Sequence, residues 1–241
     1  LLWTAAVTLM LSTAVFQRLT GPTHPLRGSC SIAGSTATYR LIRSEVTSRP
    51  AMVRIPAVAP GVDATLHWRR YPTGEPFTSE PMRRVEGRLE PELPLQPAAG
   101  KLEYFVVVRA GDDSQRLPQG EPVILRYKDP VPAGVLIPHI ALMFFGVLFG
   151  LRAGLAAAVA PDGARWLSWT TLVLLTIGGM ILGPVVQKFA FGAFWTGWPH
   201  GSDLTDNKAL VMWLAWIAAC GAIGLRPRPL TWRHRLAVVL G

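Results

Sequence analysis

The sequence predicts a membrane protein of about four spanning α-helices joined to an all-β, immunoglobulin-like domain. Half of the 241 residues are hydrophobic and only 16% are charged. The apolar residues stand in runs, as they do in membrane proteins, rather than being spread evenly. A stretch rich in proline and arginine, without long apolar runs, separates the first run from the others. We therefore expect an N-terminal transmembrane anchor at 1–18, a β-sandwich domain at 19–130 and a transmembrane helical domain at 131–241.

The N-terminal run covers residues 1–16 and ends at Gln17 and Arg18. At about 1.5 Å per residue it is slightly short for a bilayer, and it lacks an initiator methionine, so we expect further residues upstream. A cleaved signal peptide is the alternative. The small-residue pattern that a signal peptidase needs is poor before Gln17, which favours a retained anchor.

The middle stretch contains short segments in which apolar and polar residues alternate. Four are clear and two are weaker: 36–42, 64–70, 102–108 and 123–127, then 53–56 and 82–89. In the first segment, Thr38, Arg40 and Ile42 fall on one face, and Tyr39 and Leu41 fall on the other. Six or seven short strands separated by turn residues are typical of an immunoglobulin-like or fibronectin-like sandwich.

Three further apolar runs predict membrane spans at about 133–159, 166–187 and 209–225. A proline-containing turn separates the first two, and a polar, aromatic loop separates the last two. Residues 236–241 resemble the beginning of a fifth helix that is truncated.

The arginines predict the orientation of these helices. Those near the helix ends fall on one side of the arrangement: Arg152, Arg165, Arg226, Arg228, Arg233 and Arg235. Only Lys188 and Lys208 fall on the other side. Because cytoplasmic loops carry the excess of basic residues, the β-domain is expected in the periplasm of a bacterial inner membrane.

The net charge of +9 raises the question of an anionic partner. Nucleic acid is excluded as a partner because the arginines are scattered over strand-like segments and helix ends instead of clustering on one helix. Anionic lipid suits the charge.

The loop between the last two predicted spans, 194–208, is the most distinctive segment. Trp195 and Trp198 suit the membrane–water interface. Thr205 is the expected N-cap of the next helix, with Asp206 in its first turn. This interpretation makes the segment a shaped re-entrant loop leading into a capped helix.

The alternative is a loop that docks a partner or binds a ligand. Its polar contacts would be His200, Asp203, Asp206 and Asn207. Two aspartates could hold a cation such as Ca²⁺, although nothing in the sequence fixes the number of ligands.

Glycines recur every four residues in two neighbouring spans: Gly146, Gly150 and Gly154, then Gly179 and Gly183. Small residues at this spacing allow helices to approach closely. We predict a helix-packing role and leave open whether the contact is internal or with a partner. Incidental glycine in an alanine-rich chain is the alternative.

His139 is the histidine that lies clearly within a span, where it could ligate haem or a chlorophyll magnesium. It stands alone and near a helix end, so we predict that it hydrogen-bonds a neighbour and is not a ligand. No cofactor or metal is expected. The sequence also lacks a nucleophile elbow, an HExxH motif, a P-loop and paired carboxylates on a helix face, so we expect no enzyme.

Two motifs resemble a known family. They are TGPTHPLRG at 20–28, and FWTGWP at 194–199 with DLTDNK at 203–208. Both resemble a family of largely uncharacterised bacterial membrane proteins that share this layout of anchor, β-domain and helices, over nearly the whole chain. The layout is also similar to that of an accessory subunit of a bacterial photosynthetic reaction centre–light-harvesting complex. The resemblance implies no established activity.

These observations predict a non-catalytic structural or assembly subunit of a larger membrane complex. Its expected partners are other integral membrane subunits and lipid, with pigment–protein complexes nearby in the photosynthetic version. The first alternative is a stand-alone membrane sensor or transport accessory protein whose β-domain binds a solute or peptide. The second is an oxidoreductase subunit that uses His139 for haem.

Overall fold

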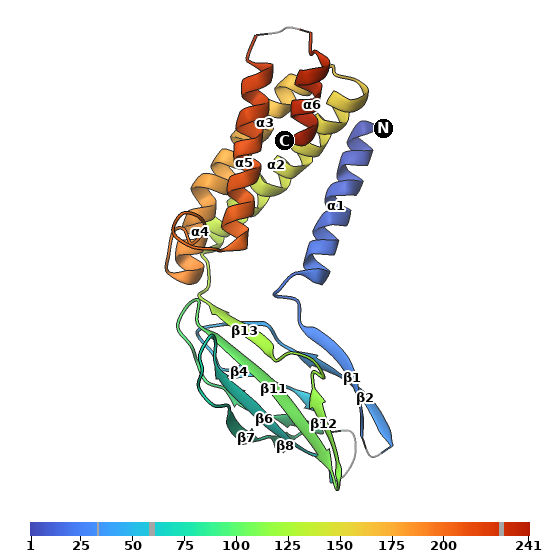
Figure 1. Cartoon of the computed structure of the whole chain (residues 1–241), viewed down its shortest axis with the longest axis vertical. Helices are drawn as coiled ribbons and strands as arrows, with labels where there is room; N and C mark the ends of the chain where they lie inside the picture. Colours follow the sequence, from blue (N-terminus) through green and yellow to red (C-terminus); the bar gives the residue numbers. More distant parts are fainter. Residues whose placement is uncertain (33, 58–60, 227–228) are drawn as a thin grey trace. The chain divides into compact units, whose positions relative to one another are not determined.

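The computed structural model describes residues 1–32, 34–57, 61–226 and 229–241. The chain divides into a β-rich unit, Leu19–Pro130, and a helical unit made of Leu1–Arg18 and Val131–Gly241 (Figure 1). Helices and a β-rich domain are therefore both present, as predicted. Arg228, which contributed to the predicted orientation, lies outside the described residues.

The β-rich unit is built around a six-stranded sheet. Its order is β3-β13-β11-β6-β7, with β12 also paired to β11. The strands are β3 (Ser44–Val46), β6 (Asp63–Arg70), β7 (Thr78–Pro81), β11 (Lys101–Ala110), β12 (Asp113–Leu117) and β13 (Val123–Lys128). The β3–β13 pair is parallel and the other pairs are antiparallel, so the sheet is mixed.

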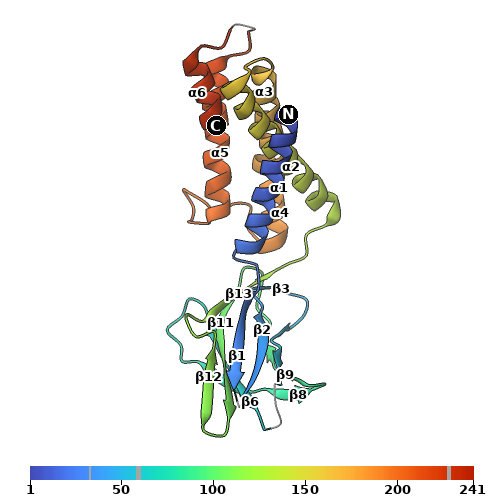
Figure 2. The same ribbon diagram turned by 90° about the vertical axis from the view of Figure 1, so that its right-hand side faces the viewer.

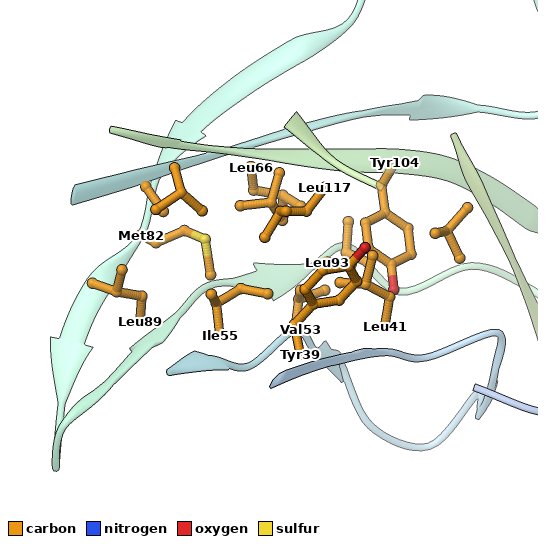
Figure 3. Packing of buried hydrophobic residues seen from close by; sticks show 14 of the residues in the cluster. Tyr39, Leu41, Val53, Ile55, Leu66, Met82, Leu89, Leu93, Tyr104 and Leu117 are labelled. Atoms are coloured by element: carbon orange, nitrogen blue, oxygen red, sulfur yellow. The ribbon is translucent and has the colours of Figure 1, made fainter. Parts of the chain in front are cut away.

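Three smaller sheets complete the unit. They pair β1 (Leu26–Ile32) with β2 (Ser35–Leu41), β4 (Ala51–Met52) with β10 (Glu92–Leu93), and β9 (Arg88–Glu90) with both β5 (Ile55–Pro56) and β8 (Arg83–Val85). Side chains from these strands and from the large sheet form one buried cluster. In Figure 3, Leu66, Tyr104 and Leu117 of the large sheet face Leu41 and Val53.

Alternation along the strands decides which side chains enter this core. Tyr39 and Leu41 are buried and Thr38 and Arg40 are exposed, so the predicted faces are confirmed along β2, whereas Ile42 follows the strand and is partly buried against the core. The fully buried Tyr104 donates its hydroxyl proton to the carbonyl oxygen of Ile42 at 2.8 Å. Burial raises the pKa of Tyr104 well above its ordinary value, and the hydrogen bond satisfies its polar tip.

The prediction of one strand at 82–89 is wrong. This segment is a hairpin, in which β8 and β9 pair around Glu86 and Gly87. Both turn residues have left-handed backbones, with φ of 46° and 75°. Positive φ at both central residues is the geometry of the tight hairpin turn whose twist matches the flanking strands.

The helical unit contains α1 (Leu2–Thr20), α2 (Ala133–Val159), α3 (Ala164–Leu175), η1 (Thr176–Leu182), α4 (Gly183–Phe191), α5 (Leu204–Ile223) and α6 (Trp232–Leu240). Within the described residues, three helices are long and apolar enough to cross a membrane: α1, α2 and the continuous Ala164–Phe191. The helix α5 covers most of the predicted span at 209–225 but does not reach the same apolarity. Its first turns hold Asp206, Asn207 and Lys208, which lower the mean hydropathy.

The C-terminal segment is helical, as predicted. Residues 236–240 belong to α6, a nine-residue helix whose Val238 is buried in the core of the helical unit. Figures 1 and 2 show α6 returning beside α5. The segment therefore packs against the other helices through Val238.

The helix from Ala164 to Phe191 changes to π-helix in its middle. In η1 the backbone N–H of Gly183 bonds the carbonyl oxygen of Gly178, five residues earlier. Gly192, with φ of 82°, ends the helix in the left-handed conformation that glycine adopts without strain. The structure thus extends the predicted span at 166–187 at both ends, and the π-helical segment was not predicted.

Candidate functional site

Two of the three predicted glycines on α2 lie where other helices approach. A Cβ on Gly146 would come within 2.8 Å of the Leu175 side chain. One on Gly150 would come within 3.1 Å of the ring of Trp216, which is itself buried in α5. Gly154 has open space at this position. The four-residue spacing therefore correctly predicted close packing at Gly146 and Gly150, but Gly154 does not take part in it.

On the facing helix the closest approach is at Gly178, which the glycine pattern missed. A Cβ there would lie 2.8 Å from Cβ of Leu142 and 3.3 Å from the backbone of α2. The predicted Gly179 and Gly183 have only ordinary van der Waals neighbours, at 3.4 Å or more. The π-helical turn shifts the register of this helix, so spacing counted on a regular helix selects the wrong glycine.

His139 lies against the same π-helical turn. Its Nδ1 donates to the carbonyl oxygen of Gly178 at 2.8 Å. The predicted hydrogen bond to a neighbour is therefore present. The bond fixes the tautomer with the proton on Nδ1, and it ties α2 to η1 close to where Gly178 allows their backbones to approach.

The loop between α4 and α5 is organised by the buried carboxylate of Asp206. Its Oδ2 accepts hydrogen bonds from the backbone N–H of Thr196 at 2.7 Å, from the Thr196 hydroxyl at 3.3 Å and from Nε2 of Gln187 at 2.9 Å. Only 6% of Asp206 is exposed. This carboxylate therefore joins the end of α4, the loop and the first turn of α5.

Neighbouring polar groups hold the loop in the same way. Oδ1 of Asn207 accepts from the backbone N–H of Trp198 at 2.7 Å. A Cβ on Gly197 would lie 2.6 Å from Cβ of Asp206, so only glycine fits there. Asp203 accepts from the backbone N–H of Thr205 at 2.9 Å and is the N-cap of α5. The prediction of Thr205 as the cap is wrong, because α5 begins at Leu204.

The apolar side chains of the loop point outward. Trp198 is 69% exposed, Leu204 71% and Phe194 57%. Lys188 covers the Phe194 ring, with its Nζ 5.6 Å from the ring centroid. Trp195 is partly buried, and its Nε1 donates to the Trp198 carbonyl oxygen at 3.0 Å. We call Phe194, Trp198 and Leu204 the apolar loop surface.

This arrangement fits the interpretation of a shaped loop that leads into a capped helix. The polar residues predicted to contact a partner, Asp203, Asp206 and Asn207, accept hydrogen bonds within the loop and from the helix ends, whereas His200 is exposed. The Asp206 oxygen that would bind a cation receives N–H and O–H donors, which is incompatible with a Ca²⁺ ligand. Across the described parts of the chain, no group of three or more His, Cys, Asp or Glu side chains could hold a metal ion.

The opposite end of the helical unit is bound together by arginines. Arg235 of α6 donates to the carbonyl oxygens of Ala157 and Ala158 at the end of α2, at 2.5 and 2.6 Å. Arg165 donates to the carbonyl oxygens of Ile223 and Gly224 at the end of α5. Cations placed on unpaired C-terminal carbonyls stabilise a helix end. These arginines therefore have a structural role beyond their effect on orientation.

In the helical unit, the Asp206 carboxylate organises the loop between α4 and α5, and arginines bind the carbonyl oxygens of helix ends at the other end. Comparisons of the chain with protein families, with curated proteins and with solved structures found no match.

Proposed function

We propose that the chain is a non-catalytic structural or assembly subunit of a larger bacterial membrane complex. The observation that carries the proposal is the apolar loop surface, held rigid by a buried hydrogen-bond network and presented outward. Rigid, exposed aromatic side chains commonly dominate binding between proteins. In this proposal the β-rich unit is an immunoglobulin-like domain in the periplasm, and the partners are other integral membrane subunits together with lipid.

Insertion into a bilayer is supported by the exposed side chains of the helices. In the most apolar stretch of α2 only 6% of residues are buried. Large apolar side chains face outward on three helical segments: Ile137, Phe144 and Phe145 on α2, Ile177 and Ile181 on η1, and Val211 and Leu214 on α5. Water would penalise so much exposed apolar surface, whereas lipid or a partner helix would cover it.

The topology of this proposal can be tested by cysteine labelling. We expect an impermeant thiol reagent added outside the cell to modify a cysteine at Asp112, in the periplasm, and to spare one at Arg233, in the cytoplasm. Both positions are exposed, and the native Cys30 and Cys220 are buried. Labelling at Arg233 with protection at Asp112 would reverse the topology, which rests on the arginines beside the helix ends.

The docking role predicts a specific loss on shortening one side chain. We expect Trp198→Ala to leave the chain inserted but to weaken association with its partner by about 2 kcal/mol or more, because exposed tryptophans are frequent binding hot spots. The measurement is partner recovery after mild detergent extraction from native membranes, beside protease protection to report insertion.

Trp232→Ala is the matched control. Trp232 is also 69% exposed, but it lies on α6 beside Arg233, away from the loop. Equal losses from both variants would show a general interfacial effect and contradict docking through the loop.

A narrower form of the proposal is that the complex is a photosynthetic reaction centre–light-harvesting complex. It requires that pigment–protein complexes co-purify with the chain and carry the absorption bands of their pigments. If the wild-type chain purifies without a stoichiometric partner, the subunit proposal is wrong, and the stand-alone sensor or transport accessory protein replaces it.

A further inference from the structure

We infer that the β-rich unit binds a small organic oxyanion, a carboxylate or a phosphate ester with a short apolar part. The site is a cavity of about 320 Å³ on the outer side of β2, β5 and β9. Its lining includes Arg40, Arg54 and Arg88 together with Thr38, Ile42 and Pro56. This inference concerns the β-rich unit alone and stands whether or not the helical unit docks a partner.

Strand register places the arginines together. Arg40 stands opposite Arg54 in an antiparallel β-bridge, and Pro56 stands opposite Arg88 in the β5–β9 pair. Residues opposite each other in antiparallel strands project from the same face. The neighbours of these arginines along the chain project the other way into the core: Tyr39, Leu41, Val53, Ile55 and Leu89. The layer formed by β2, β5 and β9 therefore buries apolar side chains on its inner face and carries the arginines on its outer face.

Positive charge on this face exceeds the negative charge that could neutralise it. Arg54 pairs with Glu90 at 2.8 Å. In the described part of the chain, Glu90 is the one carboxylate paired with any of the three lining arginines. Arg27 of β1 stands opposite Arg40 on its other side, so three arginines form a row across neighbouring strands. Like charges directly opposite destabilise a sheet, and a bound anion would relieve their repulsion.

The lining defines the chemistry of the ligand. Guanidinium groups bind carboxylate and phosphate oxygens in a bidentate fork, and the Thr38 hydroxyl can donate one more hydrogen bond. Ile42, Met52 and Pro56 supply apolar surface beside the arginines. The volume lies at the lower end of the range for small-molecule sites, about 300–1,000 Å³. A short apolar group attached to one oxyanion matches these properties.

A second cavity restricts the negative charge of the ligand to one end of the molecule. It measures about 500 Å³, shares Met52 with the first, and is lined by three carboxylates, Glu80, Glu90 and Glu92, against one arginine, Arg83. These carboxylates would repel an anion that extended beyond Met52. A ligand that carries all of its negative charge at one end is therefore favoured.

The test is isothermal titration calorimetry on the full chain in detergent. The probes are hexanoate and hexyl phosphate. Inorganic phosphate, which lacks the apolar chain, and hexanol, which lacks the charge, are the controls. We expect both hexyl oxyanions to bind, hexanol to give no heat and inorganic phosphate to bind more weakly. Stronger binding of hexanoate identifies a carboxylate ligand, and stronger binding of hexyl phosphate identifies a phosphate ester.

Variants connect the binding to the arginines. We expect Arg40→Gln and Arg88→Gln each to raise the dissociation constant about tenfold or more, because each removes a charged hydrogen-bond donor. Arg40→Lys should recover part of the affinity, since it keeps the charge and loses the fork. Arg70→Gln is the matched control, because Arg70 is exposed on the six-stranded sheet.

Unchanged affinity in Arg40→Gln and Arg88→Gln would overturn the site. Absence of binding to the wild-type chain at millimolar probe would overturn it as well. Equal affinities for inorganic phosphate and hexyl phosphate would overturn the apolar half of the ligand assignment. Both glutamine variants change exposed side chains, so circular dichroism is expected to show an intact fold.

Discussion

Gly150→Leu is expected to destabilise the helical unit by about 1–3 kcal/mol or more, as overpacking of a filled core does. Even a Cβ at this position would lie 3.1 Å from the ring of Trp216 and 3.3 Å from Cγ2 of Thr171. Trp216 is buried and Thr171 is fully enclosed, so neither can move without displacing α5 or α3 from α2. The measurement is the thermal unfolding midpoint of the purified chain in detergent, followed by intrinsic tryptophan fluorescence.

The matched control is Gly154→Leu. It makes the same chemical change on the same helix one turn later, where a Cβ would meet nothing within 4 Å. We expect its unfolding midpoint to stay close to that of the wild type. If the two variants were equally destabilised, the cost would come from the glycine replacement itself rather than from the contact with Trp216.

The second large effect is expected for Asp206→Ala. This substitution removes the acceptor of three hydrogen bonds and leaves the partly buried Thr196 N–H without its partner, while the Gln187 amide keeps only its bond to the Thr196 hydroxyl. Each unpaired buried donor costs about 1–3 kcal/mol. The loop should therefore open locally, and the apolar loop surface should lose its fixed shape. Amide hydrogen exchange at Thr196 and Trp198 measures this opening.

Asp203→Ala separates the loop network from simple capping of α5. Loss of an N-cap costs about 1 kcal/mol and acts at the helix end. We expect faster exchange at Thr205 and Asp206 in this variant, with Thr196 still protected. If Asp203→Ala released Thr196 as much as Asp206→Ala does, the buried carboxylate would not be the centre of the network.

The features that the sequence predicts well are those set by a regular period. Alternation in residues 36–42 identified the buried face of β2, and the apolar run at 133–159 matches the bounds of α2. Both depend on averages over many residues, so one unusual residue changes little. The strands β1 and β12 were missed because their sequences, LRGSCSI and DSQRL, are mainly polar.

The features that the sequence did not predict depend on single backbone groups. In the π-helical segment the backbone bonds reach the fifth instead of the fourth residue, and Gly178 rather than Gly179 lies against α2. The hairpin at 83–90 depends on two left-handed residues, one of them Glu86, which carries no turn signal of its own. The inward orientation of Asp206 depends on the fold of a loop ten residues away in sequence.

The parallel pairing of β3 with β13 has a consequence for biogenesis. Ser44 pairs with Arg126, and the N–H of Thr47 bonds the carbonyl oxygen of Lys128. This pairing closes a loop of about 80 residues, a slow step compared with forming the local hairpin of β1 and β2. During synthesis, β3 would stay without a strand partner until residues 126–128 have been made. Until that point its unpaired backbone groups would be open to pairing with other chains, which favours misassembly.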